Sequence, residues 1–459
     1  MRRIYLCLAH MSEAGFEQKY IKEAFDTNWV VPLGPNVNGF EEDLRQFTIH
    51  NSQGTIIPAL ENKKVVALSA GTAAVHLALI ACGVGPGDEV CVQSFTFCAS
   101  SHPITYLGAT PVFIDSEKDT WNMDPELLEE AIKDRIAKTG KKPKAIVPVA
   151  LYGMPYKIDR IMEIADMYDI PVIEDAAEGF GSRFNGQVLG TFGKYGVLSF
   201  NGNKMITTSG GGALITPGEE EWREIMMYAT QYRESYPYYQ HEKIGYNYRM
   251  SNICAGIGRG QMTVANDHIA HHKHVQKLYE ELLKDVKGVT VHSQPKEKCS
   301  MFNVQCSMAY DSNYWLCTIT IDEDVKIKGQ ENAYKTIVQG AVGGAAGVIH
   351  VADSATTDCQ PNENVEALRV FMDAAGIEAR PVWKPMHKQP VYCRTSEKGK
   401  VKSEKLPNGV VCQTSESSVA YINGVSEEIF KVGMCLPAGP YVTDEDVRYI
   451  VETIKSAIE

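Results

Sequence analysis

The sequence contains no Cys-x-x-Cys pair and no uncharged apolar run of about 18 residues, the length needed to span a membrane. Its twelve cysteines are scattered along 459 residues, so we interpret them as reduced packing residues and not as the disulfide framework of a small secreted protein. The N-terminal stretch MRRIYLCLAHMSEAGF has too short an apolar core for a signal peptide or a membrane anchor. We therefore expect a cytoplasmic protein without a membrane partner.

Clustered positive charge is also scarce. The formal net charge is -12 at pH 7, and the basic runs at residues 141–144 and 398–405 are short. Because neutralising a phosphate backbone requires grouped Lys and Arg, this distribution argues against a nucleic-acid partner. No internal repeat or low-complexity tract is present, and 44% hydrophobic residues suffice for a large core in two or more lobes.

Helical patterns alternate with short apolar runs over residues 1–265, which is typical of an α/β domain with a mostly parallel sheet covered on both faces by helices. The expected strands cover residues 64–68, 89–93, 110–114, 145–149, 171–174 and 196–200, and the expected helices cover residues 73–82, 125–137 and 159–168. In such a sheet, ligands bind at the carboxyl ends of the strands.

Residues 266–459 are predicted to form a smaller C-terminal α/β domain. Its expected elements are a helix at residues 270–287, a strand at 314–321 and a helix at 364–376. Two segments, near 322–362 and 393–418, are polar or glycine-rich with weak periodicity. We interpret both as insertions or long loops.

Two turns that follow predicted strands carry groups suited to a charged ligand. Gly71 and Thr72 begin an apolar helix, where unpaired backbone N–H groups and the helix dipole could hold a phosphate, although a simple turn and cap would look the same. The strand at 171–174 ends in Glu174 and Asp175. A carboxylate there can hold a proton on a heteroaromatic nitrogen, or merely cap the next helix.

Lys204 lies between a predicted buried strand and the glycine-rich run Ser209-Gly210-Gly211-Gly212. A lysine in such a turn can be dehydrated, which favours the neutral amine that forms a Schiff base, whereas most lysines are only solvent-exposed. What strengthens the catalytic interpretation is the order of the features: a phosphate turn, an aromatic loop, an Asp at a strand end, and a Lys about thirty residues later.

The chain resembles the DegT/DnrJ/EryC1/StrS sugar aminotransferases, which are fold-type-I enzymes that depend on pyridoxal 5'-phosphate (PLP). The resemblance extends from about Asn28 to Ile454, apart from the two inserted segments. Its motifs occur in order: Ser69-Ala70-Gly71-Thr72-Ala73-Ala74, Gly87-Asp88-Glu89-Val90, Ser94-Phe95-Thr96-Phe97, Glu174-Asp175-Ala176-Ala177, Ser199 to Lys204, Gly245-Tyr246-Asn247-Tyr248-Arg249-Met250, Arg380-Pro381 with Pro385-Met386-His387, and Cys435-Leu436-Pro437.

The resemblance implies a role for each matching residue. Lys204 would form the Schiff base with PLP, and Asp175 would pair with the pyridinium nitrogen. The remaining matches are the phosphate-binding residues Gly71, Thr72 and Ser199, the ring-stacking Phe97, Asn247 reaching the phosphate from the neighbouring subunit, Glu178 near the PLP 3'-oxygen, and Arg380 and His387 at the substrate entrance. Glu178 departs from the family, in which Gln or His is frequent. No metal is expected.

The implied activity is transfer of an amino group from an amino acid, with L-glutamate as the expected donor, to a nucleotide-linked keto sugar, expected to be a 4-keto-6-deoxy sugar. Pyridoxamine phosphate would be the intermediate form of the cofactor, and a homodimer with shared active sites would be required. Two alternatives stay open: a PLP-dependent sugar dehydratase, in which relatives typically replace the lysine with histidine, and a non-catalytic PLP-binding regulator.

Overall fold

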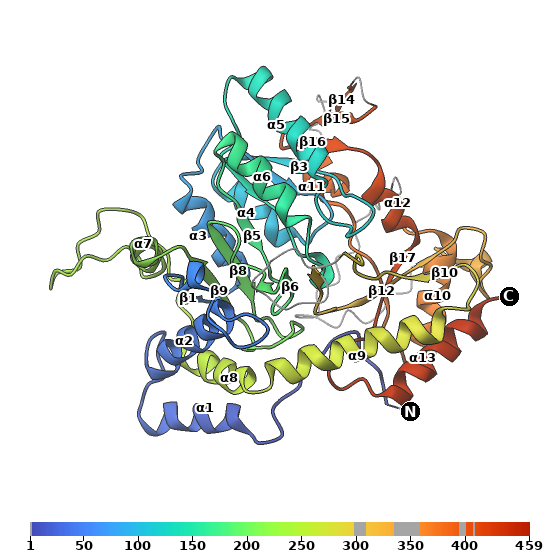
Figure 1. The fold of residues 1–459 in the computed structure, drawn as a ribbon, viewed down its shortest axis with the longest axis horizontal. Coiled ribbons are helices and arrows are strands. Elements are labelled where there is room, and N and C mark those ends of the chain that lie inside the picture. The colour runs from blue at the N-terminus through green and yellow to red at the C-terminus, as the bar shows by residue number, and fades with distance from the viewer. Residues whose placement is uncertain (1, 298–308, 335–358, 394–400, 407–408) are drawn as a thin grey trace.

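The computed structural model describes residues 2–297, 309–334, 359–393, 401–406 and 409–459 (Figure 1). The larger lobe contains two sheets with strand orders β1-β9-β8-β5 and β14-β15-β16-β3-β2-β4. Parallel bridges between Ile146 and Val172 and between Val149 and Asp175 place β4 beside β5. The strand bounds are β1 Lys64–Leu68, β2 Glu89–Gln93, β3 Thr110–Ile114, β4 Ala145–Val147, β5 Ile173–Asp175, β8 Tyr195–Ser199, β9 Gly212–Thr216, β14 Lys402–Lys405, β15 Val411–Thr414 and β16 Val419–Ile422.

The predicted mostly parallel α/β sheet is confirmed. Strand β2 pairs in parallel with β3 and β4, and β5 pairs in parallel with β8. Strand β9 runs antiparallel to both β1 and β8, so β1 and β8 point in the same direction. The carboxyl ends of β1, β5 and β8 therefore lie at one edge of the sheet.

Helices cover both faces of this sheet. Alternate residues of β1 pack into two different hydrophobic clusters, Val65 and Ala67 in one and Val66 and Leu68 in the other. The helix bounds in this lobe are α1 Phe16–Asp26, α2 Pro35–Ile49, α3 Gly71–Ala81, α4 His102–Tyr106, α5 Pro125–Thr139, α6 Ile158–Tyr168, α7 Glu219–Ala229 and α8 Asn252–Met262.

The smaller lobe is built on an antiparallel sheet of order β10-β12-β17-β13. Its strands are β10 Val289–Val291, β12 Cys317–Ile321, β13 Arg380–Pro381 and β17 Gly433–Leu436, and its helices are α9 Ala265–Leu283, α10 Glu363–Ala374, α12 Val425–Val432 and α13 Asp444–Ala457. Helix α11, Pro390–Cys393, packs instead on the larger lobe, where the ring of Tyr392 lies 4.9 Å from that of Phe113. A small sheet of order β11-β6-β7 joins the two lobes. Strand β11 (Tyr310–Asp311) follows α9 in the smaller lobe's part of the chain, whereas β6 (Arg183–Phe184) and β7 (Gln187–Val188) lie in the larger lobe's part.

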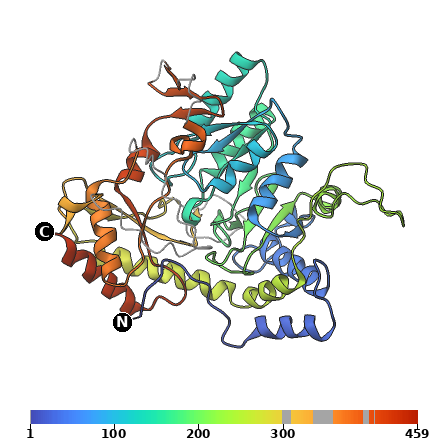
Figure 2. The same ribbon diagram turned by 180° about the vertical axis from the view of Figure 1, so that it is seen from behind.

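Both chain termini lie at the smaller lobe, although the N-terminal residues belong in sequence to the larger one (Figure 2). Ile4 forms a parallel bridge with Ile377, and the backbone N–H of Ala438 donates to the carbonyl of Leu6. The long helix α9 runs from beneath the larger lobe to α13 (Figure 1). The N-terminal segment and α9 thus connect the two lobes at the bottom of the molecule in Figure 1, on the side away from α5 and α6.

Residues 401–422 correct the sequence interpretation of the second inserted segment. The segment near 393–418 is predicted to be an insertion or long loop of the smaller domain, but its described part forms β14 and β15, which continue the larger lobe's sheet. Strand β16 pairs in parallel with β3, from Val419 with Val112 to Tyr421 with Ile114. The pairing of β16 with β3 joins segments more than 300 residues apart, so it leaves no local signal in the sequence. Strand β14 was not predicted because it is exposed throughout and lacks apolar alternation.

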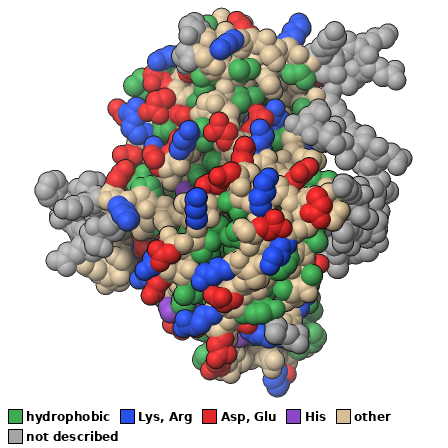
Figure 3. Space-filling model, turned by 90° about the vertical axis from the view of Figure 1, so that its right-hand side faces the viewer, with side chains coloured by type: hydrophobic (Ala, Val, Ile, Leu, Met, Phe, Trp, Pro, Cys, Tyr) green, Lys and Arg blue, Asp and Glu red, His purple; other side chains and the backbone are tan. Residues whose placement is uncertain are grey.

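Acidic and basic side chains alternate over the face of the molecule shown in Figure 3, without a large area of one sign. Within the described residues, none of the helices is long and apolar enough to cross a membrane. The ten cysteines of the described part are free thiols.

Candidate active site

The predicted site residues collect at the edge of the sheet where β1, β5 and β8 end. Asp175 is the last residue of β5, and Ser199 is the last residue of β8. The turn between β1 and α3 approaches the same edge, since a Cβ added to Gly71 would lie 3.0 Å from the Cβ of Ser199. The sheet topology therefore brings together three segments that are far apart in sequence.

Lys204 follows β8 in a turn closed by its own backbone N–H, which donates to the carbonyl of Asn201. Its side chain is only 13% exposed, with Nζ 3.5 Å from Oε1 of Glu178. The ammonium also lies 4.2 Å from the ring centroid of Trp315. Lys204 is thus largely shielded from water, held between a carboxylate and an aromatic face.

Asp175 is buried and held from two sides. Ser100 donates its hydroxyl to Oδ2 at 2.6 Å, and the backbone N–H of Ala177 donates to Oδ1 at 3.1 Å. Burial raises the pKa of the Asp175 carboxyl, while the hydrogen bond from Ser100 and the charge of Lys204 act in the opposite direction. Asp175 at the end of β5 and Lys204 after β8 therefore lie at the same edge of the sheet.

Glu178 is the closest acid to Lys204. It is 5% exposed, and its Oε2 accepts a 2.7 Å hydrogen bond from the backbone N–H of Tyr152. Burial raises the pKa of the Glu178 carboxyl, and the charge of Lys204 and the Tyr152 N–H lower it in part. Glu178 therefore pairs with Lys204, and Asp175 is a second buried acid at the same edge of the sheet.

The start of α3 is suited to an anion. No side chain caps this helix, so the backbone donors of its first turn are not used by a capping group. Gly212 at the start of β9 allows the turn to pack closely, since a Cβ there would come within 2.4 Å of the backbone N of Gly71. Gly71, Thr72 and Ser199 could accordingly hold a phosphate.

Two predicted site residues are exposed. Phe97 lies beyond the end of β2 with 57% of its surface exposed. Asn247 is also exposed, on a segment after α7 that projects far from the larger lobe before it returns beside β1 (Figure 1). Its return is fixed by bridges between Thr230 and Asn247 and between Leu68 and Arg249.

The two predicted substrate-entrance residues differ in their surroundings. Arg380 donates from Nη2 to Oε1 of Glu378 at 2.7 Å, with a side chain that is 39% exposed. The side chain of His387 is only 1% exposed, with Nδ1 2.6 Å from Oγ of Ser94 and Nε2 3.2 Å from Oε1 of Glu427. His387 thus links the chain after β13 to Ser94 beyond the end of β2 and to Glu427 of α12.

Sequence reasoning missed three side chains that contact Lys204, Asp175 or the neighbouring Tyr152, namely Trp315, Ser100 and Trp383. Ser100 follows the recognised Ser94–Phe97 motif by three residues, and that closeness was the available signal. Trp315, which donates from Nε1 to the carbonyl of Asn203 at 2.7 Å, and Trp383 come from the smaller lobe. Their contacts depend on how the lobes pack, which no local pattern reveals.

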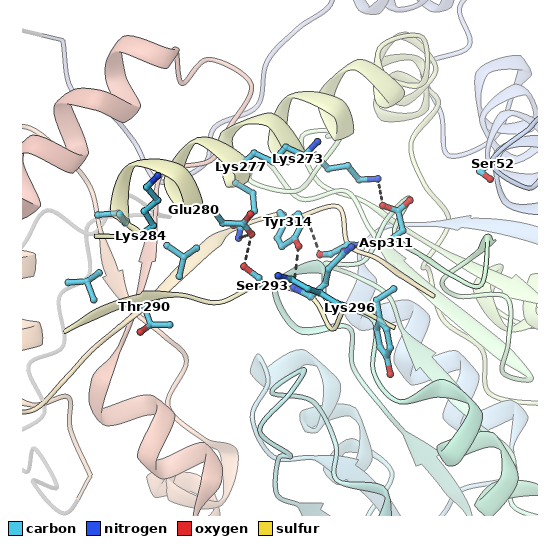
Figure 4. A pocket seen from close by; sticks show the side chains of 17 residues that line it. Ser52, Lys273, Lys277, Glu280, Lys284, Thr290, Ser293, Lys296, Asp311 and Tyr314 are labelled. Carbon is cyan, nitrogen blue, oxygen red and sulfur yellow. Dashed lines mark hydrogen bonds and ion pairs between the residues drawn. The ribbon is translucent and has the colours of Figure 1, made fainter. Parts of the chain in front are cut away.

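A cavity of about 950 Å³ lies elsewhere, along α9 and β10 (Figure 4). Lysines project around it, but Lys273 is paired with Asp311, and Glu280 accepts a hydrogen bond from Ser293. It is lined by none of the predicted site residues. In the described part of the chain, no group of three or more His, Cys, Asp or Glu could hold a metal ion.

A shielded lysine beside a buried aspartate, next to an uncapped helix start at the carboxyl edge of a mostly parallel sheet, fits the donors that PLP requires: an amine for its aldehyde, a carboxylate for its ring nitrogen and N–H groups for its phosphate. This combination of fold and site defines the class of PLP-dependent transferases.

Comparison with known proteins specifies the class further. The sequence profile of the DegT/DnrJ/EryC1/StrS aminotransferase family matches residues 12–331, and the chain belongs to this family. EpsN of Bacillus subtilis (strain 168) is 37% identical over 99% of this chain and 95% of its own, and GDP-perosamine synthase of Escherichia coli O157:H7 is 31% identical over 98% of both. A DegT DnrJ EryC1 StrS aminotransferase from Brucella abortus has a similar structure, with a TM-score of 0.73 and 25% identity, over 96% of this chain and 95% of its own. The protein is a PLP-dependent aminotransferase.

Proposed function

We propose that this enzyme moves an amino group from an amino acid, with L-glutamate as the donor, to a keto sugar carried on a nucleotide, and that the acceptor is a 4-keto-6-deoxy sugar. The net reaction exchanges the amino group of glutamate for the carbonyl oxygen of the sugar. Support comes from relatives along nearly the full chain that are named GDP-perosamine synthase, from Escherichia coli O157:H7 and Caulobacter vibrioides. The proposed compartment is the cytoplasm.

The observation that carries the proposal is the shielded Lys204, paired with Glu178 at the edge of the sheet where the buried Asp175 ends β5. PLP, when bound, supplies an electron sink that stabilises negative charge on the substrate carbon. Lys204 would bind the cofactor and then move a proton to and from that carbon, for which its shielding from water is suited. Asp175, held by Ser100, would keep the proton on the ring nitrogen.

The other predicted residues have supporting roles in this proposal. Gly71, Thr72 and Ser199 would bind the phosphate, and Phe97 would stack on the ring. Glu178 would contact the 3'-oxygen side of the cofactor, next to Lys204. Arg380 stays a proposed substrate contact, whereas the buried His387 would act by holding its segment in place.

We also propose that the enzyme works as a homodimer whose sites are shared. The projecting segment after α7 exposes large apolar side chains that the chain itself does not cover: Tyr236, Tyr238, Tyr239 and Ile244, at 49%, 69%, 64% and 86% exposure. Large exposed apolar groups of this kind mark interaction surfaces. Asn247 on the same segment would then reach the phosphate of the neighbouring site.

The experiment is to incubate the PLP-loaded enzyme with L-glutamate and a nucleotide-linked 4-keto-6-deoxy sugar, and to follow 2-oxoglutarate. We expect continued release of 2-oxoglutarate only when both substrates are present, because glutamate alone supplies a single half-reaction per bound PLP, and we expect no release from Lys204→Ala. Borohydride should attach the cofactor to Lys204. A colourless protein that PLP does not affect, or attachment at another lysine, would overturn the proposal.

A further inference from the structure

A second cavity of about 370 Å³ opens beside Phe97. We call it the Phe97 cavity; Thr96 and Phe97 line it from the larger lobe, and Trp383, Lys384, Met386 and Gln389 line it from the segment after β13. Phe97 is one wall of the proposed cofactor site, so the two spaces adjoin.

A chain of contacts ties this cavity to Lys204. The backbone N–H of Trp383 donates to the hydroxyl of Tyr152 at 2.8 Å, and the rings of these residues lie 5.4 Å apart. The backbone N–H of Tyr152 in turn donates to Glu178, the acid paired with Lys204. The position of Trp383 is therefore fixed by the same groups that surround the reactive amine.

Lys384 is the cation of this cavity, and within the described residues it forms no ion pair. Lys388, four residues later in the same segment, differs from Lys384 because its ammonium pairs with Oε2 of Glu427 at 3.0 Å. Gln389 donates to the backbone carbonyl of Lys384, which ties down its main chain. An anchored backbone, an ammonium that no acid of the described chain pairs with and an aromatic wall together suit a ligand that carries both an anion and a ring.

We propose that the Phe97 cavity binds the diphosphate-linked part of the substrate, with Lys384 pairing with the diphosphate and the ring of Trp383 packing against the adjoining sugar. The inference rests on the proposed function, since it assumes a nucleotide-linked acceptor. A diphosphate carries negative charge that a flexible ammonium can meet from several directions. Aromatic faces offer apolar area to a sugar ring at little conformational cost.

The test uses the PLP-loaded enzyme and measures binding of UDP, GDP and dTDP, each beside its nucleoside, by calorimetry. We expect Lys384→Met to weaken the nucleotide that binds by about tenfold or more, the usual scale for losing a hydrogen bond to a charged group, and to leave the nucleoside unaffected. Lys384→Arg should restore much of the affinity. Lys388→Met, which removes the paired lysine of the same segment, is the matched control and should leave nucleotide binding within about twofold.

Several outcomes would overturn the inference: equal affinity of wild type and Lys384→Met for the diphosphate, an equal loss for nucleoside and nucleotide, or no binding of any of the three diphosphates to the wild type. The proposed function is tested separately by adding L-glutamate alone, which should change the visible absorption of bound PLP in wild type and in Lys384→Met alike. A normal response to glutamate with no effect of Lys384 on nucleotide binding would reject the cavity assignment only.

Discussion

The inner and outer parts of the site differ in whether their side chains find partners within the chain. In the inner part, Lys204, Asp175 and Glu178 are shielded from water and find partners within the chain. In the outer part, Phe97 is 57% exposed and Ile244 is 86% exposed. The chain on its own therefore completes the reacting centre but leaves uncovered the surfaces that would meet the ring, the phosphate and a neighbouring subunit.

This difference predicts which property of the enzyme a substitution in each part should affect. A substitution in the inner part removes a charge from a site of low polarity, where interactions are strong and replacement by water is poor. A substitution in the outer part removes a contact to a group that is supplied from outside the chain. We expect the first kind to affect turnover and the second to affect assembly and cofactor retention.

The largest effect is predicted for Asp175→Asn. The amide keeps the shape but loses the charge that would hold a proton on the cofactor, so turnover should fall by roughly 100-fold or more, on the scale of losing about 3 kcal/mol at the transition state. Ser100→Ala should have a milder effect of roughly tenfold, because it removes one hydrogen bond to the retained carboxylate. Steady-state kinetics with saturating PLP measure both, and equal activity of Asp175→Asn and wild type would contradict the inner-part role.

Asn247→Ala tests the outer part, with a smaller expected effect. Loss of a hydrogen bond to a phosphate should weaken PLP binding by about 1 to 3 kcal/mol without unfolding the chain. Equilibrium dialysis and a thermal melt of the cofactor-free protein separate the two effects.

Mixing variants then decides whether Asn247 acts across subunits. A hybrid of Lys204→Ala and Asn247→Ala chains contains one site with both native residues only if the Asn comes from the neighbour. Recovery of tight PLP binding and of turnover on mixing is the expected result. If mixing restores neither, Asn247 acts within its own chain or not at all.

Local sequence patterns explain which parts of the fold could be predicted from the sequence. Strands β1, β2 and β3 were placed with their observed bounds because short apolar runs between turns determine buried strands. The predicted strand at 314–321 begins only at Cys317, since Tyr314 adopts a positive φ of 49°. Periodicity does not reveal such a backbone turn at a non-glycine residue.

For the site, order along the chain was enough to group Asp175 and Lys204, since both follow strands of one parallel sheet. Glu178 was expected near the cofactor, but not as the closest acid to the lysine. The contacts of Trp315 and Trp383 arise from lobe packing, and the burial of His387 depends on Ser94 and Glu427, which are distant in sequence. Long-range packing of this kind is the part that single-sequence patterns do not contain.

The smallest predicted effect concerns Glu178, where the inner part departs from the residues common in the family. Its carboxylate, 3.5 Å from Nζ of Lys204, stabilises positive charge on that nitrogen. Glu178→Gln keeps the shape and removes the charge, so the pH midpoint of the visible absorption of bound PLP should fall by about one unit. Spectra recorded from pH 5 to 10 measure this, and Glu404→Gln, an exposed acid on β14, is the control that should not move the midpoint. A midpoint that stays or rises in Glu178→Gln would contradict this prediction and show that Glu178 is neutral beside the cofactor. Burial, which raises the pKa of this carboxyl, would be the reason. Asp175 would then be the one charged acid of the inner part.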